Sequence, residues 1–175
     1  KLYTEGGDRG VFRTTNGGAT WQLILEGNDR TGFSDLVIDP SNPDVVYAAA
    51  WERLRRPWNF EEGGPGSGIW KSSDGGSNWK KLEEGLPETM GKIGIAVSPA
   101  RSDRIWAIVE AEEGGLYRSD DGGKTWERVN EDREIQTRSW YYMHVFADPL
   151  DAEVVWVLNA PAMKSIDGGK SFQRV

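Results

Sequence analysis

The stretch RSDDGGKTW, Arg118–Trp126, decides the fold because versions of it occur four times in the chain. The other copies are TTNGGATW ending at Trp21, SSDGGSNW ending at Trp79 and SIDGGKSF ending at Phe172. The closing aromatic residues are 46–58 residues apart. Repetition at this period is typical of propellers and other repeat architectures, in which each repeat is one small supersecondary unit.

Each copy has the composition of a tight turn between two strands. Glycine adopts a positive φ at little steric cost, and a turn Asp, like the Ser or Thr before it, bonds to nearby backbone. The closing aromatic is expected to bury its surface between neighbouring repeats. A calcium loop needs several oxygen ligands at set spacings, so a lone Asp in each turn predicts no metal site. We therefore expect a structural role for Asn16, Trp21, Asp74, Trp79, Asp121, Trp126, Asp167 and Phe172.

A second marker precedes each complete repeat, namely an apolar strand that ends in Asp-Pro or Ser-Pro, as in LVIDPSNPDVVYAAA. Apolar and polar residues alternate, and Gly, Pro, Asn and Asp separate the runs. In the second repeat this pattern predicts strands A to D at 34–39, 45–50, 68–73 and 78–83. Four short strands per repeat predict an all-β chain, a β-propeller of four-stranded antiparallel blades.

The chain is expected to form a single partial β-propeller over residues 1–175, with blades at approximately 1–26, 33–83, 92–129 and 140–175. Because it begins at LYTEGG, inside a B strand, we expect strands B to D of one blade followed by three full blades. An unpaired strand edge invites pairing with another strand. This predicts self-association, or further blades supplied by a longer parent chain.

Loop lengths separate the scaffold from a candidate binding face. The steps across the A–B and C–D turns are constant, at 7 and 9 residues, whereas the B–C step runs 9, 23, 11 and 7. In an antiparallel blade the B–C and D–A connections lie together on the other face. Function tends to sit on variable loops carried by a rigid scaffold, so a ligand is expected there.

The largest B–C insertion is WERLRRPWNFEEGGPGSG, Trp51–Gly68. Aromatic faces stack on sugar rings or peptide groups, and Arg binds carboxylates and lies flat on Trp. The binding candidates here are Trp51, Arg53, Arg55, Arg56 and Trp58. The alternative is a loop that packs on its own blade, with Trp inward and Arg paired to Glu52, Glu61 and Glu62.

The D–A segment that enters the last blade, EDREIQTRSWYYMHVFADP, is the second candidate. It supplies Arg138, Trp140, Tyr142 and His144, and His144 is the only histidine of the chain. A lone strand histidine is more often a packed residue than a base or a ligand. Its place on a strand A, which lines the channel of a propeller, keeps the binding hypothesis open.

Composition and motifs exclude several function classes. The net charge of −7 argues against a nucleic-acid partner, and no apolar run reaches the length of a membrane span. The absence of Cys excludes thiolate chemistry, and we expect no cofactor. No phosphate loop, G-x-S-x-G or H-E-x-x-H motif is present. Glycoside hydrolysis needs two carboxylates about 5–10 Å apart, and no spacing singles out a pair among Asp35, Glu52, Glu61 and Glu62.

The S-x-D-G-G-x-T-W turns resemble Asp-boxes, also called bacterial neuraminidase repeats. Longer phrases such as GGPGSGIWKSSDGG and RSWYYMHVFADP resemble large exported bacterial repeat proteins described as sortilin-like or glycosyl-hydrolase-like. The resemblance covers the whole chain and implies a β-propeller in a periplasmic or secreted setting. It implies no particular activity, because Asp-boxes occur in enzymes and non-enzymes alike. Asn16, Asn78 and Phe172 depart mildly from the box pattern.

Together these features favour a non-catalytic binding or scaffold module that recognises a glycan, a peptide or a protein on its B–C and D–A face. The alternative is a fragment of a sialidase-like or xyloglucanase-like glycoside hydrolase. A third possibility is a repeat segment that serves structure or assembly alone.

Overall fold

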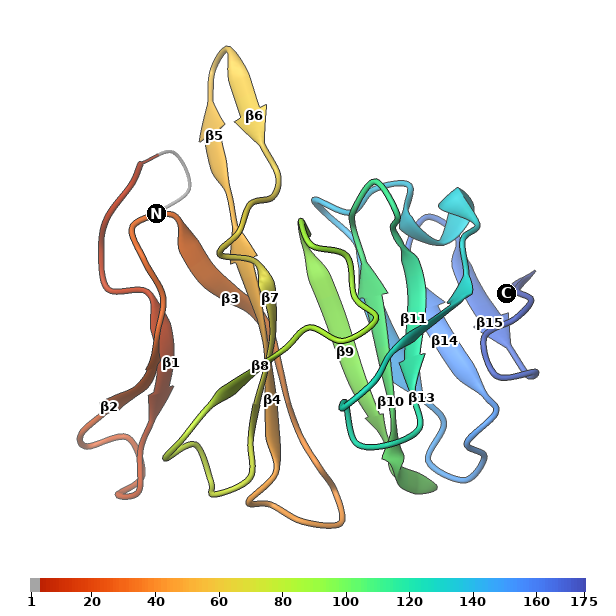
Figure 1. Ribbon diagram of the computed structural model, residues 1–175, viewed down its shortest axis with the longest axis horizontal. Coiled ribbons are helices and arrows are strands. Elements are labelled where there is room, and N and C mark those ends of the chain that lie inside the picture. The colour runs from red at the N-terminus through yellow and green to blue at the C-terminus, as the bar shows by residue number, and fades with distance from the viewer. Residues whose placement is uncertain (1–3) are drawn as a thin grey trace.

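The computed structural model describes residues 4–175, which are all-β apart from the 3-10 helix η1 (Arg133–Gln136). Four of the five sheets follow one another from left to right in Figure 1, with the chain running from one to the next. The first has two strands, β1 (Gly10–Arg13) and β2 (Gln22–Glu26). The second has β3 (Thr31–Ile38), β4 (Val46–Glu52), β7 (Gly68–Ser72) and β8 (Lys80–Leu82), paired in that order.

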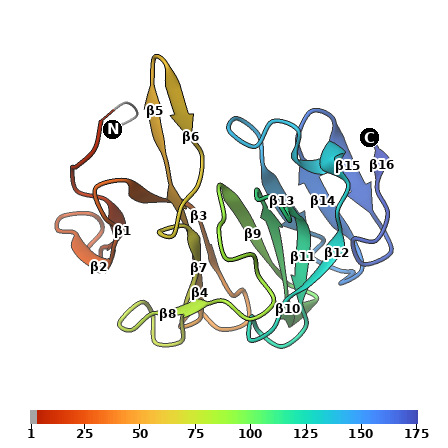
Figure 2. The ribbon, with the colours of Figure 1, turned by 45° about the horizontal axis from the view of Figure 1, so that its top comes forward.

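The third and fourth sheets repeat this antiparallel, four-stranded pattern (Figure 2). The third consists of β9 (Ile93–Ser98), β10 (Arg101–Val109), β11 (Gly115–Ser119) and β12 (Glu127–Asn130). The fourth consists of β13 (His144–Ala147), β14 (Val155–Leu158), β15 (Ala162–Ser165) and β16 (Gln173–Arg174). The predicted all-β fold of four-stranded antiparallel blades is therefore confirmed.

The first sheet differs from the expected three strands. Of the LYTEGG stretch, Thr4–Gly7 form bends rather than a strand, and Lys1, Leu2 and Tyr3 lie outside the described residues. Among residues 4–175 this blade is thus a hairpin of β1 and β2.

The core lies between sheets rather than within one of them. One buried cluster joins Tyr47 and Leu82 of the second sheet to Ile95 and Ile105 of the third. A second cluster joins the third sheet to the fourth, with Trp106 fully buried at its centre. The A strands β3 and β13 both contact β9, so the first strands of successive sheets adjoin one another. Burial of one sheet face against the next is what stacks the blades.

The Asp-box turns close each blade through side-chain hydrogen bonds to backbone amides. In the third blade, Asp121 Oδ1 accepts from the amides of Lys124 and Thr125 at 2.9 and 3.0 Å, and Ser119 Oγ accepts from Gly123 N at 2.8 Å. Both glycines of all four turns have φ between 65° and 90°. The Thr125 hydroxyl donates to Asp121 Oδ2 at 2.7 Å, and this bond, followed by the amide bonds to the carboxylate, holds the pKa of Asp121 well below its usual range.

The closing aromatic side chains are not equivalent. Trp126 is buried against the second sheet, and Phe172 packs on the core between the third and fourth sheets. The expectation that Trp21 also packs between blades is wrong, because its side chain is 62% exposed. Each box packs toward the preceding blade, and no sheet precedes β1–β2 among the described residues.

The variable and constant connections occupy opposite ends of the sheets. In each four-stranded blade, the amide of the first glycine of the Asp-box donates to a carbonyl oxygen of the A–B turn. Gly75 N donates to Asp44 O at 2.8 Å, and Gly122 N donates to Asp103 O at 2.9 Å. The largest insertion instead forms a separate hairpin, β5 (Leu54–Arg56) with β6 (Asn59–Glu61). Figure 1 shows this hairpin at the top and the β3–β4 turn at the bottom.

Candidate functional site

The insertion after β4 and the segment before β13 enclose one open pocket of about 990 Å³. These segments belong to different blades and are far apart in the sequence. The insertion contributes Arg55, Arg56, Pro57, Trp58, Asn59, Phe60 and Glu62. The other segment contributes Thr137, Arg138, Ser139, Trp140 and Tyr141.

The hairpin that forms one wall follows from its local sequence. Arg56 pairs with Asn59, so Pro57 and Trp58 form a two-residue turn. Proline presets the φ of a turn position, and this directs the chain back on itself. Leu54 anchors the base of the hairpin in the core, whereas Trp58 at its tip is 81% exposed.

The two walls meet through aromatic rings. Trp140 packs edge-on against Trp51 and Phe60, with ring centroids 4.9 and 4.1 Å away. Arg53 lies 5.2 Å and Arg55 5.5 Å from the centroid of the Trp140 ring. Edge-to-face pairs and cation–π contacts each contribute about 0.5–1.5 kcal/mol, so this stack orients the hairpin.

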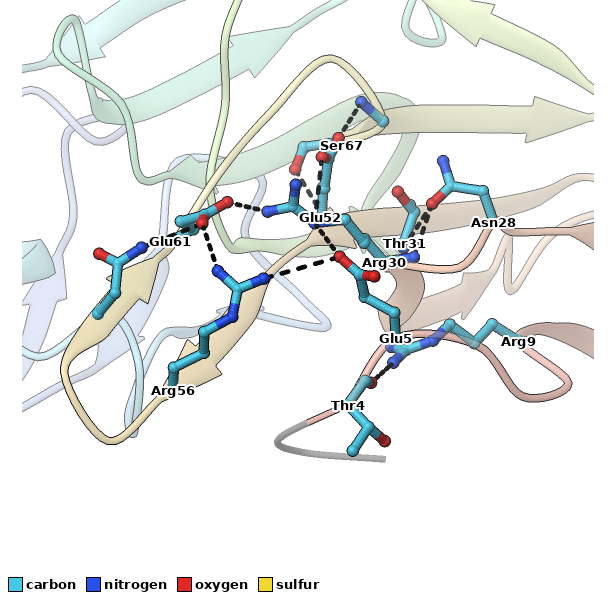
Figure 3. Close-up of polar contacts among 12 residues, drawn as sticks. Thr4, Glu5, Arg9, Asn28, Arg30, Thr31, Glu52, Arg56, Glu61 and Ser67 are labelled. Atoms are coloured by element: carbon cyan, nitrogen blue, oxygen red, sulfur yellow. Dashed lines mark hydrogen bonds and ion pairs between the residues drawn. The ribbon is translucent and has the colours of Figure 1, made fainter.

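An ion network holds the outer side of the hairpin (Figure 3). Arg30 and Arg56 both bind the Glu61 carboxylate, and Glu5 lies 4.0 Å from each guanidinium. Glu52 accepts from Gly66 N at 2.8 Å and lies 4.0 Å from Arg30. Exposed pairs of this kind are weak singly, but a network with shared partners fixes the geometry of several side chains.

A pair of carboxyl groups links the two walls, with Glu62 in the lining of the pocket and Glu110 outside it. The side chains of Glu62 and Glu110 are hydrogen-bonded to each other, and Glu110 Oε1 accepts from Ser139 Oγ at 2.5 Å. Burial, followed by the bond to Glu110 and its charge, raises the pKa of Glu62 to about 7. Lys92 lies beside this pair, and burial lowers the pKa of its ammonium group.

The structure brings together most of the residues singled out in the sequence. Arg55, Arg56, Trp58, Arg138 and Trp140 line the pocket. Trp51 and Arg53 support it from behind through their contacts with Trp140.

Two candidates lie outside this pocket. Tyr142 is half exposed next to Tyr141, with ring centroids 6.2 Å apart. His144 is an exposed residue of β13, paired with Leu158 and 6.3 Å from the Phe146 ring. His144 does not line the pocket, whereas Trp140 packs against rings of the opposite wall.

Phe60, Ser139 and Tyr141 were not among the site residues expected from the sequence, and Glu62 was considered only as one of several carboxylates. Phe60 and Tyr141 had a signal, because both sit in aromatic clusters of the candidate segments. Ser139 had none, and the link between Glu62 and Ser139 could not be foreseen, since it runs through Glu110 of a third segment. Among residues 4–175, no group of three or more His, Cys, Asp or Glu side chains is placed to hold a metal ion. That same span contains no helix with the length and apolar character needed to cross a bilayer.

Comparison with known proteins agrees with this architecture. The model of the BNR/Asp-box repeat family matches residues 117–128, which contain the third turn. No curated protein matches the chain. The *Niastella koreensis* GH74 enzyme is 18% identical, with a TM-score of 0.65, over 100% of this chain and 27% of that one.

Two further solved structures are also similar in fold at low sequence identity. The GH74 xyloglucanase from *Xanthomonas campestris* is 16% identical, with a TM-score of 0.64, over 91% of this chain and 24% of its own. YCF48 bound to D1 peptide is 14% identical, with a TM-score of 0.55, over 81% of this chain and 39% of its own. The chain therefore spans about a quarter of the GH74 enzymes. At these identities the likeness shows the fold alone.

Proposed function

Because the chain carries Asp-box repeats in a β-propeller-like fold, we propose that it is a non-catalytic binding module. Its ligand lies in the pocket between the β5–β6 hairpin and the 137–141 segment. The observation that carries the proposal is that two loops of different blades build one pocket of about 990 Å³. Ligand sites are typically concave, largely apolar and provided with a few placed polar groups.

The exposed aromatic residues of the pocket support a binding role. Trp58 and Tyr141 leave 81% and 62% of their surface exposed, although both are large apolar side chains. Covering such surface with a ligand yields about 25 cal/mol for each Å² removed from water. Aromatic side chains that become buried on binding carry much of the affinity of many interfaces.

The walls are also preorganised. Trp51, Trp140 and Phe60 are packed together, and Glu61 is held by two arginines. A ligand therefore meets side chains that are already ordered. Preorganisation raises affinity because less conformational entropy is lost on binding.

The carboxylates of this face support the non-catalytic part of the proposal. Glu52 and Glu61 are engaged by Arg30, and Asp35 accepts from Leu36 N at 2.9 Å and Ile95 N at 3.0 Å. Glu62 and Glu110 are hydrogen-bonded to each other. A retaining glycosidase places its carboxyl groups about 5 Å apart and an inverting enzyme about 6.5–9.5 Å apart. A directly bonded pair fits neither arrangement.

The relatives in fold include glycoside hydrolases and a protein in complex with a peptide. The fold thus accommodates both ligand classes, and a glycan or a peptide is the proposed ligand here. The extracytoplasmic setting is likewise a proposal, based on the resemblance to exported repeat proteins.

Binding to printed glycan and peptide arrays tests the proposal. We expect the chain to retain a ligand and Trp58→Ala to lose it. Trp21→Ala is the matched control, because it removes another exposed tryptophan, one that does not line the pocket. Equal loss in both variants, or no captured ligand, contradicts the module. Release of reducing sugar from a bound glycan would support the glycosidase alternative.

A further inference from the structure

Three arginines at the pocket carry charge that no described carboxylate neutralises. Arg53, Arg55 and Arg138 form no ion pair within residues 4–175, whereas Arg56 is bound to Glu61 and lies 4.0 Å from Glu5. The whole chain has a net charge of −7, whereas the pocket lining holds three arginines, Arg55, Arg56 and Arg138, and one carboxyl group, that of Glu62. A concave site in which one sign of charge predominates concentrates ligands of the opposite sign.

Arg55 and Arg138 are the arginines that reach the pocket itself. Arg55 is partly covered by the rings of Phe60 and Trp140, at 5.5 Å from each centroid, which limits its freedom. Arg138 is exposed. A guanidinium presents a planar fork of donors that matches a carboxylate, and such charge-assisted pairs are the stronger hydrogen bonds.

Flat apolar rings stand next to these charges. Trp58 and Tyr141 line the same pocket and are mostly exposed. The ring face of an aromatic side chain offers a large apolar surface with a polar edge, and this suits a ligand that alternates C–H and hydroxyl groups. A sugar ring that also bears a carboxylate would satisfy both features.

Resting on the proposed function, we propose that the pocket selects an acidic glycan. The guanidinium groups of Arg55 and Arg138 bind the uronate carboxylate, and Trp58 and Tyr141 cover the pyranose ring.

An acidic peptide is less well matched. Peptides bound by strand addition obtain affinity from main-chain hydrogen bonds along a free sheet edge. Here the strands of the hairpin, β5 and β6, have three residues each. The pocket instead offers side-chain rings and guanidinium groups.

The test is isothermal titration with hexagalacturonate, with the carboxyl-reduced neutral hexamer and with a hexaglutamate peptide. We expect the acidic hexamer to bind at least about tenfold more tightly than the neutral one, as loss of a charge-assisted hydrogen bond predicts. Raising the ionic strength to about 0.5 M should weaken the acidic hexamer selectively.

Variants assign the effect to the two arginines. Arg138→Gln should weaken hexagalacturonate about tenfold and leave the neutral hexamer unchanged. Arg55→Lys should weaken it less than Arg55→Gln does, because charge is kept but the fork is lost. Arg101→Gln is the matched control, since Arg101 pairs with Asp120 at the A–B turn end of the third sheet. Thermal melts check that each variant is folded.

The outcomes separate this inference from the proposed function. Equal affinity for the acidic and neutral hexamers overturns acid selection and leaves the binding module standing. Binding of hexaglutamate without hexagalacturonate overturns the glycan in favour of a peptide. If none of these probes nor any array ligand is bound, the module itself is overturned.

Discussion

Lys71 Nζ donates a 2.8 Å hydrogen bond to the carbonyl oxygen of Gly122, across the boundary between the second and third blades. The same contact recurs at the other two blade boundaries. Arg13 Nη1 donates to Gly75 O at 2.6 Å, and Arg118 Nη1 to Gly168 O at 3.2 Å. A cation on the C strand of each of the first three blades therefore binds the Asp-box of the next blade.

This contact predicts a stability effect for Lys71→Met, which keeps the apolar stem and removes the donor. We expect a loss of about 1 kcal/mol, the usual worth of one hydrogen bond, because Tyr47 Oη still donates to Gly122 O at 3.1 Å. Urea unfolding measures the change. Lys80→Met on the exposed neighbouring strand is the control, and an equal loss in both variants would refute the contact's role.

The lowered pKa values of the Asp-box carboxyl groups predict how the free energy of unfolding falls at acid pH, here called the acid limb. Hydrogen bonds lower the pKa of Asp74 and Asp167 to about 2, and that of Asp121 is lowered too. A carboxyl whose folded pKa is depressed stabilises the fold above its unfolded pKa, near 3.9. Stability should therefore fall as the pH drops from about 4 to 2.

Asp121→Asn should flatten part of this acid limb and cost about 1 kcal/mol at neutral pH. The fold tolerates the change, because Asn16 fills the same position in the first box and donates to Thr20 Oγ1 at 2.9 Å. Unfolding free energies between pH 2 and pH 7 provide the measurement. An acid limb identical to that of the native chain would contradict the assignment.

The raised pKa of Glu62 predicts that the free energy of unfolding decreases as the pH rises near neutrality, opposite in sign to the acid limb. Its pKa rises from 4.5 to about 7 in the fold, so the native state binds a proton that the unfolded chain has released. The associated stability is complete below about pH 4.5 and is lost as the pH rises through 7. Glu62→Gln should remove this slope, whereas Glu112→Gln, on an exposed turn residue, should retain it. Denaturation at a series of pH values distinguishes them.

The ring contacts of Trp140 are expected to stabilise the position of the β5–β6 hairpin. Trp140→Ala removes the ring that contacts both Trp51 and Phe60, and partial burial makes a loss of about 2 kcal/mol the expected result. Amides of β5 and β6 should exchange faster with solvent, while those of β9 and β10 keep their protection. Trp58→Ala should leave exchange unchanged, because that ring is exposed. Unaltered exchange in Trp140→Ala would show that the ion network alone suffices.

Self-association is predicted from an exposed apolar face on the first blade. Phe12 and Leu23 are paired across β1 and β2 and exposed by 40% and 41%, beside the exposed Trp21. On the last blade, Lys164 of β15 occupies the position that Lys71 has on the second blade, and there it lies over the Trp156 ring. Light scattering should detect a dimer or larger species that Leu23→Ser dissociates, and a monomeric native chain would contradict this.

Much of the fold could be predicted from residues close together in the chain. The Gly-Gly turns, the alternating strands and the constant spacing of the A–B and C–D turns specify a blade through local backbone chemistry. The same spacing predicted that the Trp51–Gly68 insertion lies at the end opposite the glycine turns, and its β5–β6 hairpin lies there (Figure 1).

The sequence by itself determined the repeating unit and identified two candidate segments. Only the tertiary structure decided that Arg55 and Arg138 share a pocket, that Glu62 bonds to Glu110, and that Trp21 faces solvent. The physical reason is one of range. Turn and strand preferences are set by neighbours a few residues away, whereas pocket walls and the burial of an aromatic ring depend on how whole blades pack, which no local pattern encodes.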